Sequence, residues 1–108
     1  DQALRREFAM LDAEIRALEL TNARFLLTPS EQAALPAFAS VLKLKGTEIQ
    51  QDLHMLLAKL AGEDGLEQPE SAEHGPHLVQ RYLFSRALSI YGGTSEIQKG
   101  ILARTVLT

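Results

Sequence analysis

The feature that most constrains the fold of this chain is an uninterrupted helical repeat across its first quarter. Residues 2–27 contain neither Gly nor Pro, and apolar side chains recur there at alternating steps of four and three residues. This spacing aligns them along one side of an α-helix, while charged and small residues fill the other sides. We therefore predict one long amphipathic helix over residues 2–27, whose stripe consists of Leu4, Phe8, Leu11, Ile15, Leu18, Asn22 and Phe25.

Asn22 is the polar member of this stripe. A structural role at the edge of the core is favoured over a ligand contact, because buried polar groups usually have structural partners. The following residues, 28–31, read as a break in the helix, since Pro29 disfavours helical geometry at Thr28. Thr28 and Glu31 fit a capping box, and Pro36 then allows only a short helical turn before the next long helix.

A second long helix is predicted over residues 36–60. Lys45 interrupts its apolar face, where its stem can lie along the surface with the charge in water. Gly46 lies inside this helix, where glycine is less favourable than alanine, so its predicted use is to allow the close approach of a neighbouring helix. His54 has no second metal ligand at useful spacing, so a surface or bundle-edge role is favoured. The apolar face consists of Phe38, Val41, Leu42, Ile49, Leu53, Leu56 and Leu60.

Residues 61–77 are rich in Gly, Pro and acidic side chains and predict a long loop. His74 and His77 flank a Gly-Pro pair there, which is typical of an exposed turn rather than a metal site. A third helix is predicted over residues 77–90, and paired glycines stop it. A fourth helix then begins, with Thr94 or Ser95 as its N-cap, and Ser95 with Gln98 fits a capping box.

The bulk properties agree with an all-α chain. Hydrophobic residues make up 45% of the 108, whereas aromatic residues make up 6% and there is no Trp, which favours helix packing over a β-sandwich. The prediction is a single domain over residues 1–108, an up-and-down bundle of three main helices plus a short C-terminal helix. Because the chain begins without Met inside helical sequence, we expect it to be a fragment of a longer protein.

Charge and cysteine usage narrow the functional classes. A net charge of −3 without a basic cluster does not favour nucleic-acid binding. The absence of cysteine excludes disulfides and thiolate metal sites, and we predict no metal site of any kind. No apolar run has the length of a membrane span, and no signal peptide is recognisable at the N-terminus. A cytoplasmic location is expected, since a chain without cysteine is compatible with a reducing cytoplasm.

One tract carries a specific resemblance. Residues 82–104, YLFSRALSIYGGTSEIQKGILAR, resemble the C-terminal signature of acyl-CoA dehydrogenases almost residue for residue. Residues 40–53, SVLKLKGTEIQQDL, look like the preceding helix of bacterial members, and residues 11–18, LDAEIRAL, fit the helix before that. The resemblance therefore covers essentially the whole chain.

The resemblance implies a C-terminal helical domain of a flavoenzyme. Members bind FAD and an acyl-CoA, whose α-proton goes to a carboxylate while the β-hydride passes to the flavin. Electrons then leave to electron-transfer flavoprotein or a similar acceptor. Most members are tetramers centred on these C-terminal bundles, so a homo- or hetero-oligomer is expected. The chain lacks the Gly-Gly-x-Gly segment that helps to hold FAD in many members, and it stops without the usual Leu-Gly-Leu-Pro-type tail.

The resemblance also assigns residues. Gly92 stands where many members carry the catalytic Glu, so it can supply only its backbone N–H to the thioester oxygen, an oxyanion-type contact. Thr94 and Glu96 match FAD-binding positions, and Glu96 fits cofactor contact or capping better than proton abstraction. Tyr91 and Gly92 would line the acyl-thioester end. Arg86 and Arg104 match structural positions.

The missing carboxylate at Gly92 leaves two routes to a base. Some members place it on the first bundle helix, which we expect to precede the start of this sequence, whereas others form mixed complexes in which one subunit has no base. The leading hypothesis is a segment of an FAD-dependent acyl-CoA dehydrogenase, which is inactive in isolation. The alternative is a non-catalytic helical subunit or scaffold of a heteromeric complex. An autonomous bundle of unrelated function is the weakest alternative.

Overall fold

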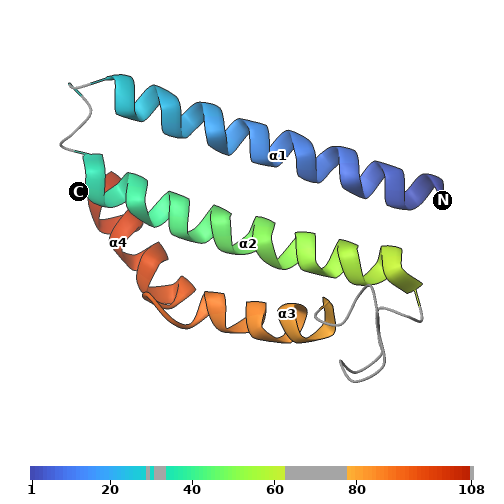
Figure 1. Cartoon of the computed structure of the whole chain (residues 1–108). Coiled ribbons are helices and arrows are strands. Elements are labelled where there is room, and N and C mark those ends of the chain that lie inside the picture. Colours follow the sequence, from blue (N-terminus) through green and yellow to red (C-terminus); the bar gives the residue numbers. More distant parts are fainter. Residues whose placement is uncertain (29, 31–33, 63–77, 108) are drawn as a thin grey trace.

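The chain folds into helices arranged side by side (Figure 1). The computed structural model describes residues 1–28, 30, 34–62 and 78–107. The described elements are α1 (Gln2–Leu27), α2 (Leu35–Ala61), α3 (Leu78–Ser85), the 3₁₀ helix η3 (Arg86–Ser89) and α4 (Ser95–Leu107), with no strand in these ranges. The sequence therefore predicted the first helix to the residue and the second to within one residue at each end.

Helices α1 and α2 run antiparallel and share the principal core. Glu7 on α1 forms an ion pair with Lys59 near the end of α2, with 3.0 Å between Oε2 and Nζ. At the opposite end, the Phe25 and Phe38 rings stack with their centroids 4.1 Å apart. Between these pairs lies a buried apolar cluster, and its burial removes apolar area from water and fixes the register. The cluster consists of Leu11, Ile49 and Leu56, flanked by Leu4, Ile15, Leu18 and Leu53.

Several details of the predicted faces are corrected. Phe8 and Leu60 were placed on the apolar faces of α1 and α2, but they are 59% and 57% exposed, because the contact between the two helices is narrower than the predicted faces. Lys45 lies on an exposed side of α2, where its Nζ is 3.1 Å from Glu48 Oε2. The close approach expected at Gly46 is not found within the described part of the chain, where a Cβ added at Gly46 would meet no atom within 4 Å. Asn22 is half-buried beside a hollow that Leu18 and Leu42 also line, in agreement with a core-edge role.

Helix α2 is central to the fold, since α1, α3, η3 and α4 all pack on it. In Figure 1, α1 and α3 lie on opposite sides of α2, and α4 turns back beside the first turns of α2. The predicted third helix is split: α-helical bonding stops at Ser85, and a 3₁₀ helix continues to Ser89. The last turn before the glycine pair is therefore wound more tightly than the single α-helix that the apolar spacing of this segment predicted.

Some predictions fall outside the described residues. They include Pro29 and Glu31 of the proposed capping box, most of the loop over residues 61–77, and both His74 and His77. Thr28 itself is described, and its hydroxyl donates to the Arg24 carbonyl at 2.8 Å, which helps to close α1. Within the described part, no helix is long and apolar enough to cross a membrane.

The bundle leaves a large apolar surface exposed. Large hydrophobic residues of α1, α2 and α4 are exposed, among them Met10 at 62%, Leu60 at 57% and Ile97 at 58%. Leucines at the ends of α1 and α4 are almost fully exposed, with Leu27 at 82% and Leu107 at 81%. Apolar surface of this extent is typical of a domain that is buried against other protein.

Candidate functional site: the Gly-Gly turn between η3 and α4

The end of α3 is fixed by a buried serine. Ser85 is 2% exposed, and its hydroxyl donates to the Tyr82 carbonyl one turn earlier. The Ser85 carbonyl in turn accepts a hydrogen bond of 2.9 Å from Gln51 Nε2 on α2. The point where the α-helix tightens into η3 is thus held directly by a polar side chain of α2.

A second attachment lies three residues further on. Lys43 Nζ donates to the Leu88 carbonyl and lies 3.3 Å from Thr47 Oγ1, while Thr47 Oγ1 is itself 3.5 Å from the Leu88 carbonyl oxygen. The carbonyls at the end of a helix lack intrahelical partners and must be satisfied from elsewhere. Lys43 and Thr47 meet that need for η3.

Tyr91 is placed by main-chain bonds and by its neighbours. The N–H groups of Ile90 and Tyr91 both donate to the Ala87 carbonyl at 2.9 Å. The Tyr91 ring lies 6.4 Å from the Phe84 ring, and the Lys43 ammonium is 5.9 Å from its centroid. Tyr91 is 48% exposed, so part of its surface remains accessible.

The glycine pair forms a left-handed turn. Gly92 has φ +68° and Gly93 has φ +97°, a region that residues with a Cβ rarely adopt. The Gly92 carbonyl accepts from Gln98 Nε2 at 3.2 Å. No acceptor among the described residues pairs with the Gly92 N–H. The turn therefore leaves a backbone donor available at the residue that the sequence singled out.

Helix α4 is capped by Thr94. Its Oγ1 accepts from the Ile97 N–H at 3.2 Å, and its carbonyl accepts from the Gln98 N–H at 2.9 Å. The predicted capping box of Ser95 with Gln98 is wrong, because Gln98 is used instead to hold the Gly92 carbonyl. Since Thr94 Oγ1 serves the helix as an acceptor, its own O–H remains able to donate to a ligand.

Glu96 lies in the first turn of α4 and is exposed. A carboxylate there interacts favourably with the positive end of the helix dipole. No described residue pairs with it, so it can accept hydrogen bonds from hydroxyl groups of a ligand. The structure thus brings Tyr91, Gly92 and Thr94 into one turn, with Glu96 directly after it.

These residues can accommodate a hydroxyl-rich cofactor such as FAD. Thr94 keeps a donor and Glu96 offers acceptors, and the helix that carries them has 13 residues. A flavin's ribityl chain and ribose need polar partners of both kinds. Their assignment as cofactor contacts remains a prediction.

Sequence reasoning missed the three α2 residues that hold the turn: Lys43, Thr47 and Gln51. The available signal was their spacing of four residues, which places polar groups along one side of a largely apolar helix. Their partners, however, are main-chain carbonyls more than thirty positions away, and side-chain periodicity carries no information about such contacts.

A groove opens beside the turn, between α2 and α3, with a volume of about 280 Å³. Tyr91 and Phe84 supply its aromatic wall, and Arg81 supplies a cation. His54 lies at its edge, where Nδ1 is 2.8 Å from the Gln50 carbonyl. The bundle-edge role expected for His54 agrees with this position. Arg86 stacks over the Tyr82 ring at 5.1 Å, as suits its predicted structural role.

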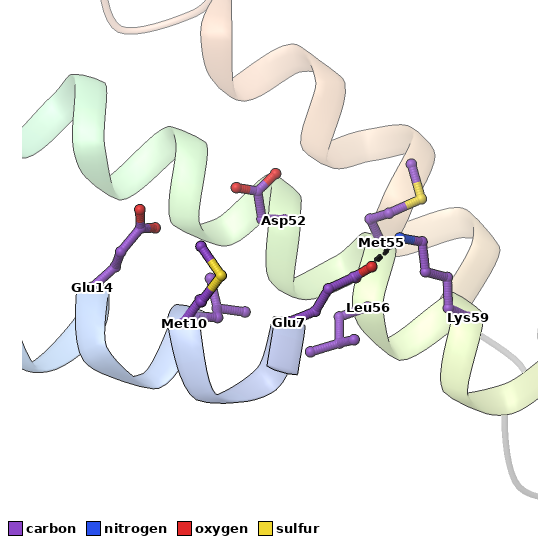
Figure 2. Close-up of a pocket in the computed structure, with 8 residues that line it drawn as sticks. Glu7, Met10, Glu14, Asp52, Met55, Leu56 and Lys59 are labelled. Carbon is purple, nitrogen blue, oxygen red and sulfur yellow. Dashed lines mark hydrogen bonds and ion pairs between the residues drawn. The ribbon is translucent and has the colours of Figure 1, made fainter. Parts of the chain in front are cut away.

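A different hollow of about 230 Å³ lies between α1 and α2 (Figure 2). Its apolar lining combines the buried Leu11 and Leu56 with the exposed Met10 and Met55, and Glu14 of α1 and Asp52 of α2 also line it. Glu7 is held by Lys59 through the ion pair described above. Among the described residues, no group of His, Cys, Asp or Glu could hold a metal ion. This hollow therefore offers no evident chemistry.

The fold and the turn together define the class of this domain: an all-α arrangement whose helix connection presents a backbone donor next to a capped helix. The sequence profile described as acyl-CoA dehydrogenase, C-terminal domain matches residues 1–107. The chain therefore belongs to the acyl-CoA dehydrogenase C-terminal domain family. No curated protein and no solved structure matches it.

Proposed function

We infer that this domain works as part of an FAD-dependent acyl-CoA dehydrogenase, which introduces an α,β double bond into an acyl-CoA thioester. The observation that carries the proposal is the Gly92 N–H, which lies in a left-handed turn without an acceptor among the described residues. A donor fixed in this way can stabilise the enolate-like oxygen that develops when a proton leaves the α-carbon. Family membership supports the reaction class.

The other roles follow from the same turn. Thr94 would donate to, and Glu96 would accept from, a bound FAD, while Tyr91 would line the thioester end of the substrate. Bound FAD would supply the hydride acceptor for the β-hydrogen, with an electron-transfer flavoprotein or similar protein as the final electron acceptor. The α-proton goes to a carboxylate outside position 92, either elsewhere in the same polypeptide or on a sister subunit. The exposed apolar surface serves the oligomer interface.

The test uses the protein purified with its natural partners. Bound flavin should be visible in the absorbance spectrum, and adding acyl-CoA should bleach it and reduce an added electron acceptor. Thr94→Val should weaken flavin retention, whereas the neighbouring Ser95→Ala should leave it unchanged. A colourless preparation that stays inactive with acyl-CoAs of short, medium and long chain would sink the proposal.

A second candidate is a non-catalytic subunit that keeps the fold for assembly. The absence of a carboxylate at Gly92 favours it, because the usual base cannot act from there. This role predicts that a sister acyl-CoA dehydrogenase subunit assembles with the chain, and that all flavin in the complex belongs to the sister. Flavin stoichiometry measured together with complex mass distinguishes the two. One flavin per subunit excludes the scaffold.

A further inference from the structure

The polar row on α2 has no role in the function proposed above. Lys43, Thr47 and Gln51 are spaced four residues apart, so they lie on one side of the helix. This side faces η3, because Gln51 bonds to the Ser85 carbonyl at its beginning and Lys43 bonds to the Leu88 carbonyl near its end. The row therefore holds η3 at both ends.

Lys43 reaches furthest toward the turn. A Cβ placed on Gly92 would lie 3.5 Å from Lys43 Cε, and the Lys43 ammonium is 5.9 Å from the Tyr91 ring centroid. Lys43 Nζ also donates a hydrogen bond to the carbonyl of Leu88, which lies four positions before Gly92. One side chain thus contacts the chain just before the turn and lies against the turn itself.

The energetics favour Lys43 as the principal attachment. A hydrogen bond from a charged donor contributes more than one from a neutral donor, and it is stronger in a half-buried setting than in water. Lys45, two residues later on the same helix, is exposed and forms an ion pair with Glu48. The two lysines therefore provide a matched pair: one holds the turn, and the other does not.

We propose that Lys43, supported by Thr47 and Gln51, is a positioning residue that sets the direction of the Gly92 N–H. Its chemical consequence rests on the proposed function, because only an acyl-thioester gives that N–H a developing oxyanion to stabilise. The positional claim itself is independent of the reaction. Lys43 touches neither substrate nor flavin in this assignment, and it acts through the η3 carbonyl and the turn.

The first experiment measures the turn in the assembled holoprotein. Amide hydrogen–deuterium exchange is followed over residues 86–94 in wild type, Lys43→Met and the control Lys45→Met. Loss of a charge-assisted hydrogen bond should raise exchange there at least about tenfold in Lys43→Met. Lys45→Met should match wild type. Equal exchange in the two variants would overturn the positioning role, whatever reaction the protein catalyses.

A second variant covers failure of Lys43→Met to assemble. Gln51→Met removes the hydrogen bond to the Ser85 carbonyl with little change in volume, and it should raise exchange over residues 86–94 by about fivefold. Exchange over α1 should stay at the wild-type rate. If Lys43→Met does not assemble and Gln51→Met leaves exchange at residues 86–94 unchanged, the proposal is wrong.

The chemical consequence is read from a bound thioester. Acetyl-CoA has no β-hydrogen, so it cannot be dehydrogenated, and an isotope-labelled carbonyl reports polarisation through a lower infrared stretching frequency. Lys43→Met should lose most of the shift seen in wild type, and with an oxidisable acyl-CoA its kcat should fall about tenfold while KM changes less than twofold. An unaltered carbonyl shift in Lys43→Met would refute the positioning of the N–H. No shift in wild type would refute the proposed function instead.

Discussion

Gln98 Nε2 donates to the carbonyl oxygen of Gly92 at 3.2 Å, so a side chain from the first turns of α4 closes the turn that precedes it. The N–H and the carbonyl of a peptide unit are rigidly coupled, because each peptide group is planar. Fixing the Gly92 carbonyl therefore limits the rotation of the Gly92–Gly93 peptide plane. On the N-terminal side of the turn, the hydrogen bond from Lys43 to the Leu88 carbonyl holds η3 and so limits the movement of the residues that lead into Gly92. The turn is held from both sides.

Gln98→Met should loosen this turn without unfolding α4. The substitution keeps the length and helix propensity of the side chain but removes the donor, so the free energy of unfolding should fall by about 1 kcal/mol. Chemical denaturation of the assembled protein measures the change. Lys99→Met, on the exposed side of the same helix, should be close to neutral. Equal stability of the two variants would show that the Gln98 bond contributes nothing.

Alanine at the two turn glycines should destabilise in a defined order. Both have positive φ, which costs about 1–2 kcal/mol for a residue with a Cβ. A Cβ at Gly92 would meet Lys43 Cε at an ordinary 3.5 Å, whereas a Cβ at Gly93 would clash with the Gln98 side-chain amide. Gly93→Ala must therefore also displace Gln98 from the Gly92 carbonyl.

Gly93→Ala should accordingly unfold at a lower denaturant concentration than Gly92→Ala, and both at a lower one than wild type. The double variant Gly93→Ala/Gln98→Met should lose less free energy of unfolding than the two single variants lose together, since both changes remove the same hydrogen bond. Additive costs in this double-mutant cycle would contradict the coupling of Gly93 to Gln98.

The long helices could be predicted from sequence because their signal is local. Residues 2–27 lack any helix breaker, and their helical period persists for seven positions, six of them apolar, so even the end residues were recovered. Phe8 was misplaced because periodicity gives the direction of a side chain but not the width of the surface that the partner helix covers.

The site was only partly predictable. Tyr91, Gly92 and Thr94 stood out because paired glycines before a capping residue have few conformations. Whether Thr94 or Ser95 is the N-cap depends on the residue at which the backbone leaves the left-handed turn and becomes helical. The backbone angles of the turn decide this. The change from α3 to η3 could not be predicted, because it depends on contacts with α2, which is distant in sequence. Lys43 of α2 donates to the Leu88 carbonyl of η3.

Gly46→Ala should stabilise the protein. Gly46 lies inside α2, its φ is not positive, and an added Cβ meets no atom of the described residues within 4 Å. Alanine is favoured over glycine in a helix interior by up to about 1 kcal/mol. Thermal unfolding should show a higher Tm for Gly46→Ala, and a lower Tm would indicate that another chain of the assembly packs closely against this position.

The Lys45–Glu48 pair should give a pH-dependent contribution to stability. The hydrogen bond to Glu48, followed by the charges of Glu48, Glu14 and Asp52, raises the pKa of Lys45. A pKa raised on folding gives stabilisation that is complete below the unfolded-state pKa, about 10.4. It is lost as the pH rises through the folded-state pKa.

The measurement for Lys45 is an NMR titration of its Cε resonance between pH 8 and 12 (a range of about two units on either side of the ordinary lysine value). Glu48→Gln should lower the Lys45 pKa toward that value, and Glu14→Gln should lower it less. Because the pair is exposed, its effect on stability should be small and should weaken further with added salt. A pKa that does not respond to Glu48→Gln would rule out the pairing.

Thr94→Val should destabilise α4, whereas Ser95→Ala should not. Valine keeps the shape of threonine but cannot accept the Ile97 N–H, and loss of an N-cap costs about 1 kcal/mol. Thr94→Ser keeps the hydroxyl and should restore most of that loss. Chemical denaturation and the circular dichroism of the assembled protein measure the effect. If Ser95→Ala cost as much as Thr94→Val, the cap would lie at Ser95, and the hydroxyl proposed to donate to the flavin would have to be reassigned.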